Sequence, residues 1–320
     1  MLRAAIQAAP TCRPSRSTGS TGDVARTRAT GLCALETFRN IAHEGRALPS
    51  GLEFRQQAYR HVNPSSSISL CVSNRNRLWQ LRQTLAANLA AAGDRHRVVL
   101  VDYGSTDDTQ AWVWETFSEA IDEGRLTFFE VTNPVFWHMA RAKNLSHRFA
   151  PSAYCFNLDA DNFVDGTDLG LIEESARAGR VCHQFSGVLT DGSCGRIGLP
   201  KELFLLMGGY DESMLPMSWQ DIDLVRRIRA SGRDVVRLPA PRIPAIANTQ
   251  QQKLLECGRV GDSARSDYDQ MKTLNQSLAK TRMQLEGPYR GGGFASFEGR
   301  LNGQAVIIDG FDNIHPRTSA

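Results

Sequence analysis

The stretch "RVVLVDYGSTDDT", residues 97–109, joins an apolar run to a tight turn and a helix start. The run is rich in valine, which is typical of a buried strand. Asp102 ends the run, and Gly104 allows the chain to turn sharply. Ser105 or Thr106 then offers a helix N-cap, followed by acidic residues in the first turn. This order predicts a strand that leads directly into a helix.

The same alternation continues on both sides of this stretch. Apolar spacing at Leu78, Leu81 and Leu85 predicts a helix between two strands. Strands are expected at 67–74, 97–102, 125–131 and 152–158, with a further helix at 140–150. Strands that alternate with helices form parallel sheets covered by helices, so the fold class is α/β.

Three segments are expected along the chain. Residues 65–250 carry the alternating pattern and form one domain, and the pattern persists to about residue 239. Residues 1–64 are an N-terminal extension, partly disordered, with a short amphipathic helix over 32–41. Residues 251–320 form a C-terminal helix and a glycine-rich tail that pack on the domain.

Composition excludes several classes of protein. With 41% hydrophobic and 22% charged residues the chain is globular, and its net charge of +3 predicts no nucleic-acid partner. It lacks an apolar run of about 18–20 residues, so we expect no transmembrane segment. Seven scattered cysteines argue against a disulfide framework. The expected location is cytoplasmic, with any membrane contact peripheral.

Two carboxylates, Asp159 and Asp161, follow the strand in "FNLDADNFVD", residues 156–165. Charge at the edge of a core is costly unless a positive partner meets it, and a divalent metal would be such a partner. A calcium loop starting at Asp159 is excluded, because Val164 stands where that loop requires glycine. The plain structural alternative is an aspartate pair that caps the following turn.

A second acidic pair, Asp221 and Asp223, begins an amphipathic helix in "MGGYDESMLPMSWQDIDLVRRIRASG", residues 207–232. The helix dipole favours acids in a first turn, so capping alone explains one of them. The same dipole would keep Asp221 ionised at neutral pH, as a general base must be.

Cations cluster in two segments, "SNRNRLWQLRQTL" at 73–85 and "HMARAKNLS" at 138–146. They supply more positive charge than two helix faces need, and arginine and lysine suit a diphosphate. Solvated surface charge is the alternative for each one taken singly. The residues are Arg75, Arg77, Arg141 and Lys143.

These strings together resemble family-2-like glycosyltransferases of the GT-A fold, with similarity to the galactosyltransferase and chondroitin-polymerase-like branch. Residues 98–109 resemble the family's V-D-D/N-G-S-T-D-D-T, with Tyr103 departing at one position. The later acidic segment resembles G-G-(F/Y)-D-E followed by W-x-E-D-x-D, with Gln220 where glutamate is common. The resemblance covers roughly residues 67–250.

The resemblance implies a single GT-A domain, a mostly parallel sheet flanked by helices. It implies a metal-dependent, inverting, hexosyltransferase-type enzyme of polysaccharide biosynthesis, which moves a sugar from a UDP-sugar to a hydroxyl of a glycan or glycoconjugate. Asp221 would be the catalytic base, and Asp161 with Asp159 would hold Mn²⁺ or Mg²⁺. The implied nucleotide-sugar-binding residues are Asn74, Arg75, Arg77, Asp102, Arg141, Lys143, Asn144 and Asp159. The implied acceptor-side residues are Gly209, Tyr210, Trp219 and Gln220.

One departure leaves two questions open. Asn248 stands where related enzymes place a histidine as third metal ligand, so the third ligand is either Asn248 or His315 from the tail. An amide oxygen is a poorer ligand for Mn²⁺ than imidazole but suits hard cations. Together with Gln220, this departure keeps an alternative function open: a catalytically silent sugar-nucleotide-binding protein on the same fold.

Overall fold

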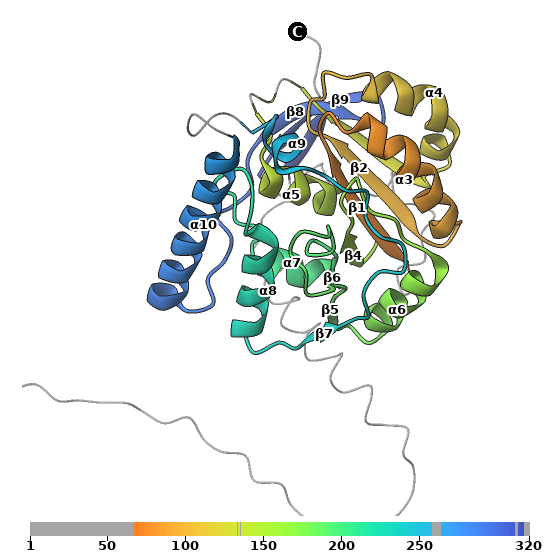
Figure 1. Cartoon of the computed structure of the whole chain (residues 1–320). Coiled ribbons are helices and arrows are strands. Elements are labelled where there is room, and N and C mark those ends of the chain that lie inside the picture. The colour runs from red at the N-terminus through yellow and green to blue at the C-terminus, as the bar shows by residue number, and fades with distance from the viewer. Residues whose placement is uncertain (1–66, 133, 135, 258–263, 311–312, 317–320) are drawn as a thin grey trace, which may run out of the picture. The chain divides into compact units, whose positions relative to one another are not determined.

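The structure is a computed structural model that describes residues 67–132, 134, 136–257, 264–310 and 313–316. The helix predicted over 32–41 lies outside the described residues. In the described part, strands and helices alternate around one large sheet (Figure 1). The elements along the first half are β1 (Ile68–Asn74), α3 (Leu78–Ala92), β2 (Arg97–Asp102), α4 (Thr109–Asp122), β3 (Leu126–Val131), α5 (Met139–Phe149), β4 (Tyr154–Asn157) and α6 (Gly166–Arg177).

The second half departs from strict alternation. Its elements are β5 (Val181–His183), β6 (Ile197–Pro200), α7 (Lys201–Leu206), α8 (Gln220–Ala230), β7 (Val235–Arg237), α9 (Gln250–Leu254), α10 (Ala264–Glu286), β8 (Phe297–Leu301), β9 (Gln304–Asp309) and β10 (Asn313–Pro316). Across the described residues the strand order is β10-β9-β8-β3-β2-β1-β4-β6-β5-β7.

The centre of the sheet is parallel, as the sequence predicted. Strands β3, β2, β1 and β4 pair in parallel, with Asn74 opposite Asp102 and Asp102 opposite Glu130. Parallel strands end at the same sheet edge, so the residues that follow β1, β2 and β4 lie near one another. This edge is where open α/β sheets bind their ligands.

Antiparallel pairs flank this parallel centre on both sides, although the outermost pair on one side, β5 with β7, is parallel again. On one side β6 runs antiparallel to β4 and to β5, and on the other β8 pairs with β3 and is followed by β9 and β10. The short apolar run "QAVIID", residues 304–309, forms β9, inside a three-stranded extension of the main sheet. The chain's last strands complete the sheet instead of forming a separate unit.

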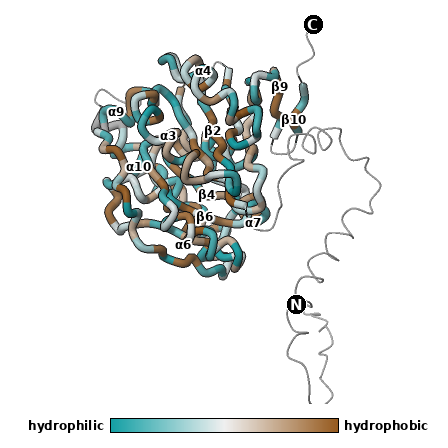
Figure 2. The backbone as a smooth tube through the Cα atoms, turned by 90° about the vertical axis from the view of Figure 1, so that its right-hand side faces the viewer, coloured by the Kyte–Doolittle hydropathy of each residue, from teal (hydrophilic) through white to brown (hydrophobic). Residues whose placement is uncertain are grey.

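Helices cover both faces of the sheet. Apolar side chains of α3, α4 and α6 pack with one face, around Leu70, Leu100 and Phe128. Helix α5 packs on the opposite face, against Val99 and Phe129. Figure 2 shows hydrophobic stretches along the interior strands. Burial of these large side chains supplies most of the driving force for this architecture.

Helix α4 begins later than predicted. Its first residue is Thr109 and its N-cap is Asp108, so the prediction of Ser105 or Thr106 as N-cap is wrong. The Ser105 hydroxyl is instead hydrogen bonded to the Asp102 carboxylate, and Asn76 Oδ1 accepts the N–H of Thr106 at 2.6 Å. The side chain of Asn76, in the loop after β1, thus accepts a backbone N–H of the turn that follows β2.

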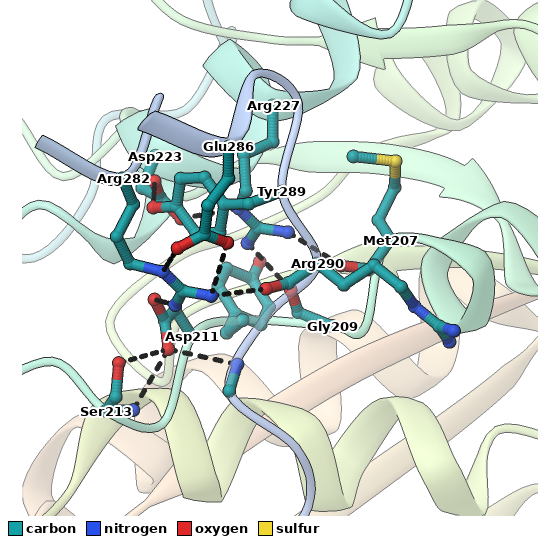
Figure 3. A network of polar contacts seen from close by, with 12 residues as sticks. Met207, Gly209, Asp211, Ser213, Asp223, Arg227, Arg282, Glu286, Tyr289 and Arg290 are labelled. Atoms are coloured by element: carbon teal, nitrogen blue, oxygen red, sulfur yellow. Dashed lines mark hydrogen bonds and ion pairs between the residues drawn. The ribbon is translucent and has the colours of Figure 1, made fainter. Parts of the chain in front are cut away.

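The C-terminal segment is tied to the loop before α8 by a buried polar network (Figure 3). The Arg282 guanidinium pairs with Asp211 at 2.7 Å and lies 4.0 Å from the centre of the Tyr289 ring. The Tyr289 hydroxyl donates to Asp223, whose other oxygen pairs with Arg227 at 2.7 Å. These contacts therefore hold helix α10 against the loop before α8 and its first turn.

Backbone contacts reinforce this junction. The Gly291 N–H donates to the Met207 carbonyl at 2.8 Å. A Cβ at Gly291 would lie 2.3 Å from the Gly208 carbonyl oxygen, a distance that no side chain tolerates. The glycine-rich stretch after α10 is therefore required for close packing of two loops.

Candidate active site

A cavity of about 320 Å³ opens at the carboxyl ends of β1 and β4. Its walls come from the β1–α3 loop, the loop after β4, the start of α8, and residues within 248–256 and 268–272. Charged and aromatic side chains lining it include Arg75, Arg77, Trp137, Lys143, Asp159, Asp161, Trp219, Asp221, Lys253, Glu256, Tyr268, Asp269 and Lys272.

Lys143 is the centre of the cavity's charge cluster. Its Nζ lies 2.8 Å from Asp221 Oδ1 and 3.0 Å from Asp159 Oδ1, and its side chain is only 1% exposed. The Asp221 side chain is 13% exposed and that of Asp159 is 34% exposed. One buried ammonium therefore bridges the predicted base and a predicted metal ligand.

The ionisation of this cluster follows from burial and charge together. Burial opposes the charged form of Lys143, but the two carboxylates outweigh it and raise the pKa of Lys143 well above its usual value. Burial raises the pKa of Asp221, and the Lys143 ammonium works in the opposite direction. Lys143 therefore carries its charge at any physiological pH and favours the ionised form of Asp221.

Asp161 lies on the other side of Asp159. Its carboxylate accepts hydrogen bonds from the side-chain amides of Asn162 at 2.7 Å and Asn248 at 2.6 Å. Burial raises the pKa of Asp161, and the neighbouring Asp159 charge raises it further. Neutral amides only partly balance a buried carboxylate, so this site favours a cation.

Gly195 lines the cavity and lies close to this cluster. A Cβ at this position would lie 2.7 Å from Asp159 Oδ2 and 3.0 Å from Lys143 Nζ. Its carbonyl oxygen accepts a hydrogen bond from Asn157 Nδ2 at 2.9 Å. The sequence analysis missed this glycine, because nothing in "DGSCGRIG" indicates which loop it packs against.

The two arginines after β1 line the cavity and hold its outer wall. Arg75 pairs with Glu256 at 3.0 Å and donates to the Tyr103 carbonyl at 3.1 Å. Arg77 donates to the carbonyl of Gln252. Both predicted cations therefore face the cavity and also fasten the segment around α9 above it.

Asp102 occupies a different environment. It is fully buried, and its two oxygens accept hydrogen bonds from Asn74 Nδ2 at 3.0 Å, the Ser105 N–H at 3.2 Å, the Ser105 hydroxyl and Gln110 Nε2 at 2.8 Å. Among the described residues that line the cavity, neither Asp102 nor Asn74 occurs. Asp102 was predicted to contact the nucleotide sugar, and that contact would therefore require this loop to change its conformation.

Other predicted residues lie behind the cavity wall. Asn144 receives the Tyr210 N–H at 2.8 Å and donates to the Tyr210 carbonyl and to Glu212. Gln220 is buried and donates to the Leu215 carbonyl at 2.7 Å. Of the described residues predicted as site residues, those outside the cavity lining are Asn74, Asp102, Arg141, Asn144, Gly209, Tyr210 and Gln220.

The two candidates for a third metal ligand are far from equivalent. Asn248 lines the cavity and contacts Asp161. His315 is exposed on β10, the last strand of the C-terminal extension, and is absent from the described lining of the cavity. No group of three or more histidine, cysteine, aspartate or glutamate side chains that could hold a metal occurs within the described residues.

The sequence analysis also missed the contribution of the C-terminal segment. Lys253 and Glu256 flank the end of α9, and Tyr268, Asp269 and Lys272 come from the first turns of α10. Their spacing is that of an ordinary polar helix face, so no local signal identifies them.

Within the described chain, no helix is long and apolar enough to cross a membrane.

Among solved structures the chain is similar to a mannosyltransferase of Pyrobaculum calidifontis in complex with GDP-Man and Mn²⁺, at 18% identity over 74% of this chain and 78% of that chain, with a TM-score of 0.47. It is similar to S. aureus TarS in complex with UDP-GlcNAc, at 14% identity over 69% and 68% of the two chains, with a TM-score of 0.47.

A third similar structure is the catalytic domain of Drosophila beta1,4galactosyltransferase 7 in complex with xylobiose, at 15% identity over 79% and 95% of the chains and a TM-score of 0.44. A comparison with curated proteins finds no match. The sequence model of glycosyl transferase family 2 matches residues 69–235, more than half of the chain. The chain therefore belongs to glycosyl transferase family 2 and is a glycosyltransferase with the predicted GT-A fold.

Proposed function

We propose that the chain is a metal-dependent, inverting glycosyltransferase that transfers a sugar from a UDP-sugar to a hydroxyl of a glycan or glycoconjugate, in polysaccharide biosynthesis. The observation that carries this proposal is the cluster of Asp159, Lys143 and Asp221 beside Asp161 at one cavity. A carboxylate base and an acidic pair for a cation are the two parts that sugar transfer from a nucleotide diphosphate requires.

The cluster's charge balance supports a divalent cation. Three carboxylates, Asp159, Asp161 and Asp221, line the cavity, and the buried ammonium of Lys143 pairs with Asp159 and Asp221. Their oxygens are the hard ligands that Mg²⁺ and Mn²⁺ prefer. Asp159 and Asp161 would hold the ion, and when bound it would offset the negative charge that develops on the departing diphosphate.

The amide of Asn248 is suited to completing this site. Asn248 Nδ2 faces Asp161, while its Oδ1 accepts a hydrogen bond from Gln80 Nε2 at 2.7 Å. Gln80 Oε1 is buried without a hydrogen-bond partner. Turning both amides over would pair that oxygen and direct the Asn248 oxygen toward Asp161. A cation beside Asp161 would favour this arrangement, because an amide oxygen is a metal ligand and an amide N–H is not.

Asp221 takes the role of general base. The acceptor hydroxyl oxygen attacks the anomeric carbon of the donor, and its proton passes to the Asp221 carboxylate. A new carbon–oxygen bond forms while the bond to the diphosphate breaks, and UDP leaves with the electron pair. Attack from the face opposite the leaving group inverts the anomeric configuration.

Lys143 positions this base. Both of its contacts are carboxylates, 2.8 and 3.0 Å away, so its ammonium is already engaged. It fixes Asp221 next to Asp159 and favours the ionised, proton-accepting form. The other cations that line the cavity, and that would meet the donor's phosphates, are Arg75, Arg77, Lys253 and Lys272.

The test is release of free nucleotide from a panel of UDP- and GDP-sugars, each with Mn²⁺, with Mg²⁺ and with excess chelator. We expect a UDP-sugar to be turned over only when a divalent ion is present. Product anomeric configuration, read by NMR coupling constants, should be opposite to that of the donor. Turnover that survives chelation, or retention of configuration, would contradict the proposal. Binding of UDP without turnover of any donor would favour the catalytically silent alternative.

A further inference from the structure

The turn that leads into α8 has an unusual backbone. Ser218 and Trp219 both have φ of 77°, a region that residues other than glycine seldom adopt and that costs free energy. Trp219 is the N-cap of α8, and both residues line the cavity. Asp221 follows two residues later, so the position of the base depends on this turn. Contacts from elsewhere must hold the turn in place.

Asn275 of α10 makes those contacts. Its side chain is buried, with 1% of the residue exposed. Its Nδ2 lies 2.8 Å from the Ser218 carbonyl, 3.1 Å from that of Met217 and 3.2 Å from that of Leu215. Its Oδ1 accepts the Leu215 N–H at 2.7 Å. One amide therefore fixes both ends of the segment from 215 to 218.

The orientation of this amide is determined by its partners. Turning it over would place its oxygen against three carbonyl oxygens and its NH₂ against an N–H donor. Among short side chains, asparagine alone carries an amide, which offers two N–H donors and a separate carbonyl acceptor. Aspartate would bring a charge against the carbonyls, and leucine would fill the space without satisfying any of them.

We propose that Asn275 is a positioning residue for transfer: it holds the strained turn at 218–219 that presents Trp219 and Asp221 to the cavity. The inference rests on the proposed function of Asp221. Asn275 lies outside residues 69–235, the part matched by the family model, so this task falls to the chain's own C-terminal helix.

The experiment compares Asn275→Leu and Asn275→Ser with a control on the same helix, Arg282→Met. Arg282 holds Asp211 at 2.7 Å and so stabilises the same junction away from the strained turn. For Asn275→Leu we expect kcat to fall about 100-fold, the typical cost of a small misplacement of a reacting group. The KM for the donor should change little, because the donor cations and acids are untouched. Asn275→Ser keeps one donor and should fall in between.

A structural readout accompanies the kinetics. Hydrogen exchange of the amides from 215 to 223 should accelerate in both Asn275 variants and stay near the wild-type rate in Arg282→Met, which should lose stability but keep its kcat. Wild-type kcat and unchanged exchange in both Asn275 variants would overturn the inference, and so would equal losses of kcat in the Asn275 variants and in Arg282→Met. Absence of turnover in the wild type would instead reject the proposed function, and the exchange measurement would still test the role of Asn275.

Discussion

Asp102 ends β2 and Asp161 follows β4, at the same edge of the sheet, yet the two carboxylates have different surroundings. Burial raises the pKa of both. Asp102 is fully buried and accepts four hydrogen bonds, from Asn74 of β1, Ser105 of its own loop and Gln110 of α4. Asp161 receives two side-chain amides, lies beside the charge of Asp159, and faces the cavity.

The difference separates an acid held by internal hydrogen-bond donors from an acid that, under the proposed function, would bind a cation. Each hydrogen bond to a carboxylate contributes about 1.5–3 kcal/mol, so four donors can compensate the burial of Asp102 without help from a ligand. Asp161 and Asp159 place two carboxylates close together at an open cavity, and a bound cation would relieve the repulsion between them. Strand position predicts where both acids lie, but the number of internal donors decides what each does.

The largest effect should come from Asp221→Asn, which tests the cavity side of this comparison. The amide cannot accept the acceptor's proton, so we expect kcat to fall by about 10²- to 10⁴-fold. UDP affinity, measured by calorimetry, should stay near wild type because the change removes charge from the base alone. Unchanged turnover would show that another group is the base.

Lys143→Met removes the buried cation that pairs with Asp221. The hydrogen-bond donors of Asp102 include no such cation. We expect kcat to fall about 100-fold at neutral pH, a typical loss for one buried electrostatic contact. Transfer needs ionised Asp221, so the rate falls as pH drops through the pKa of Asp221. Without Lys143 that pKa rises further, because burial is then unopposed. The acidic limb of the pH–rate profile should therefore move to higher pH. A profile in the original place would exclude this role for Lys143.

Asp102→Asn sharpens the comparison from the other side. The new NH₂ group would face a donor such as Gln110 Nε2, and one unsatisfied buried group costs about 1–3 kcal/mol of stability. We expect a lower denaturation midpoint in urea, with UDP affinity near wild type. Loss of UDP binding in a fully stable variant would support the sequence-based prediction that Asp102 contacts the donor.

The smallest effect is expected for His315→Ala. His315 is exposed on β10 and does not contribute to the described cavity lining. Nucleotide release and its metal dependence should match the wild type in parallel assays. A raised metal requirement would bring His315 back as a ligand and would require the C-terminal strand to move.

Local patterns predicted the centre of the fold well. Apolar runs and helical spacing located β1, α3, β2, β3, α5 and β4, because each element's pattern reflects its own buried face. The antiparallel pairs on both sides of the parallel centre were not predicted. The strands that pair there lie far apart in the chain, so no short stretch of sequence indicates the pairing. The misplaced start of α4 has the same origin: Ser105 had a better partner, Asp102, than the helix N-terminus.

The candidate site was predictable in part for similar reasons. An acidic pair after a strand, an acidic pair at a helix start and a cluster of cations pointed to Asp159, Asp161, Asp221 and Lys143, which do line one cavity. The sequence could not show that Lys143 faces two carboxylates, because that contact joins residues 16 and 78 positions apart. Nor could it reveal Asn275, whose partners are the backbone atoms of a distant turn.

The central claim is that the acids at this cavity hold a nucleotide diphosphate through a divalent cation. Calorimetric titration of UDP into wild type and Asp161→Ala, with Mn²⁺ and with chelator, tests it most directly. We predict metal-dependent binding in the wild type and none in the variant. UDP binding that is equally strong in Asp161→Ala, or in the presence of chelator, would contradict the account.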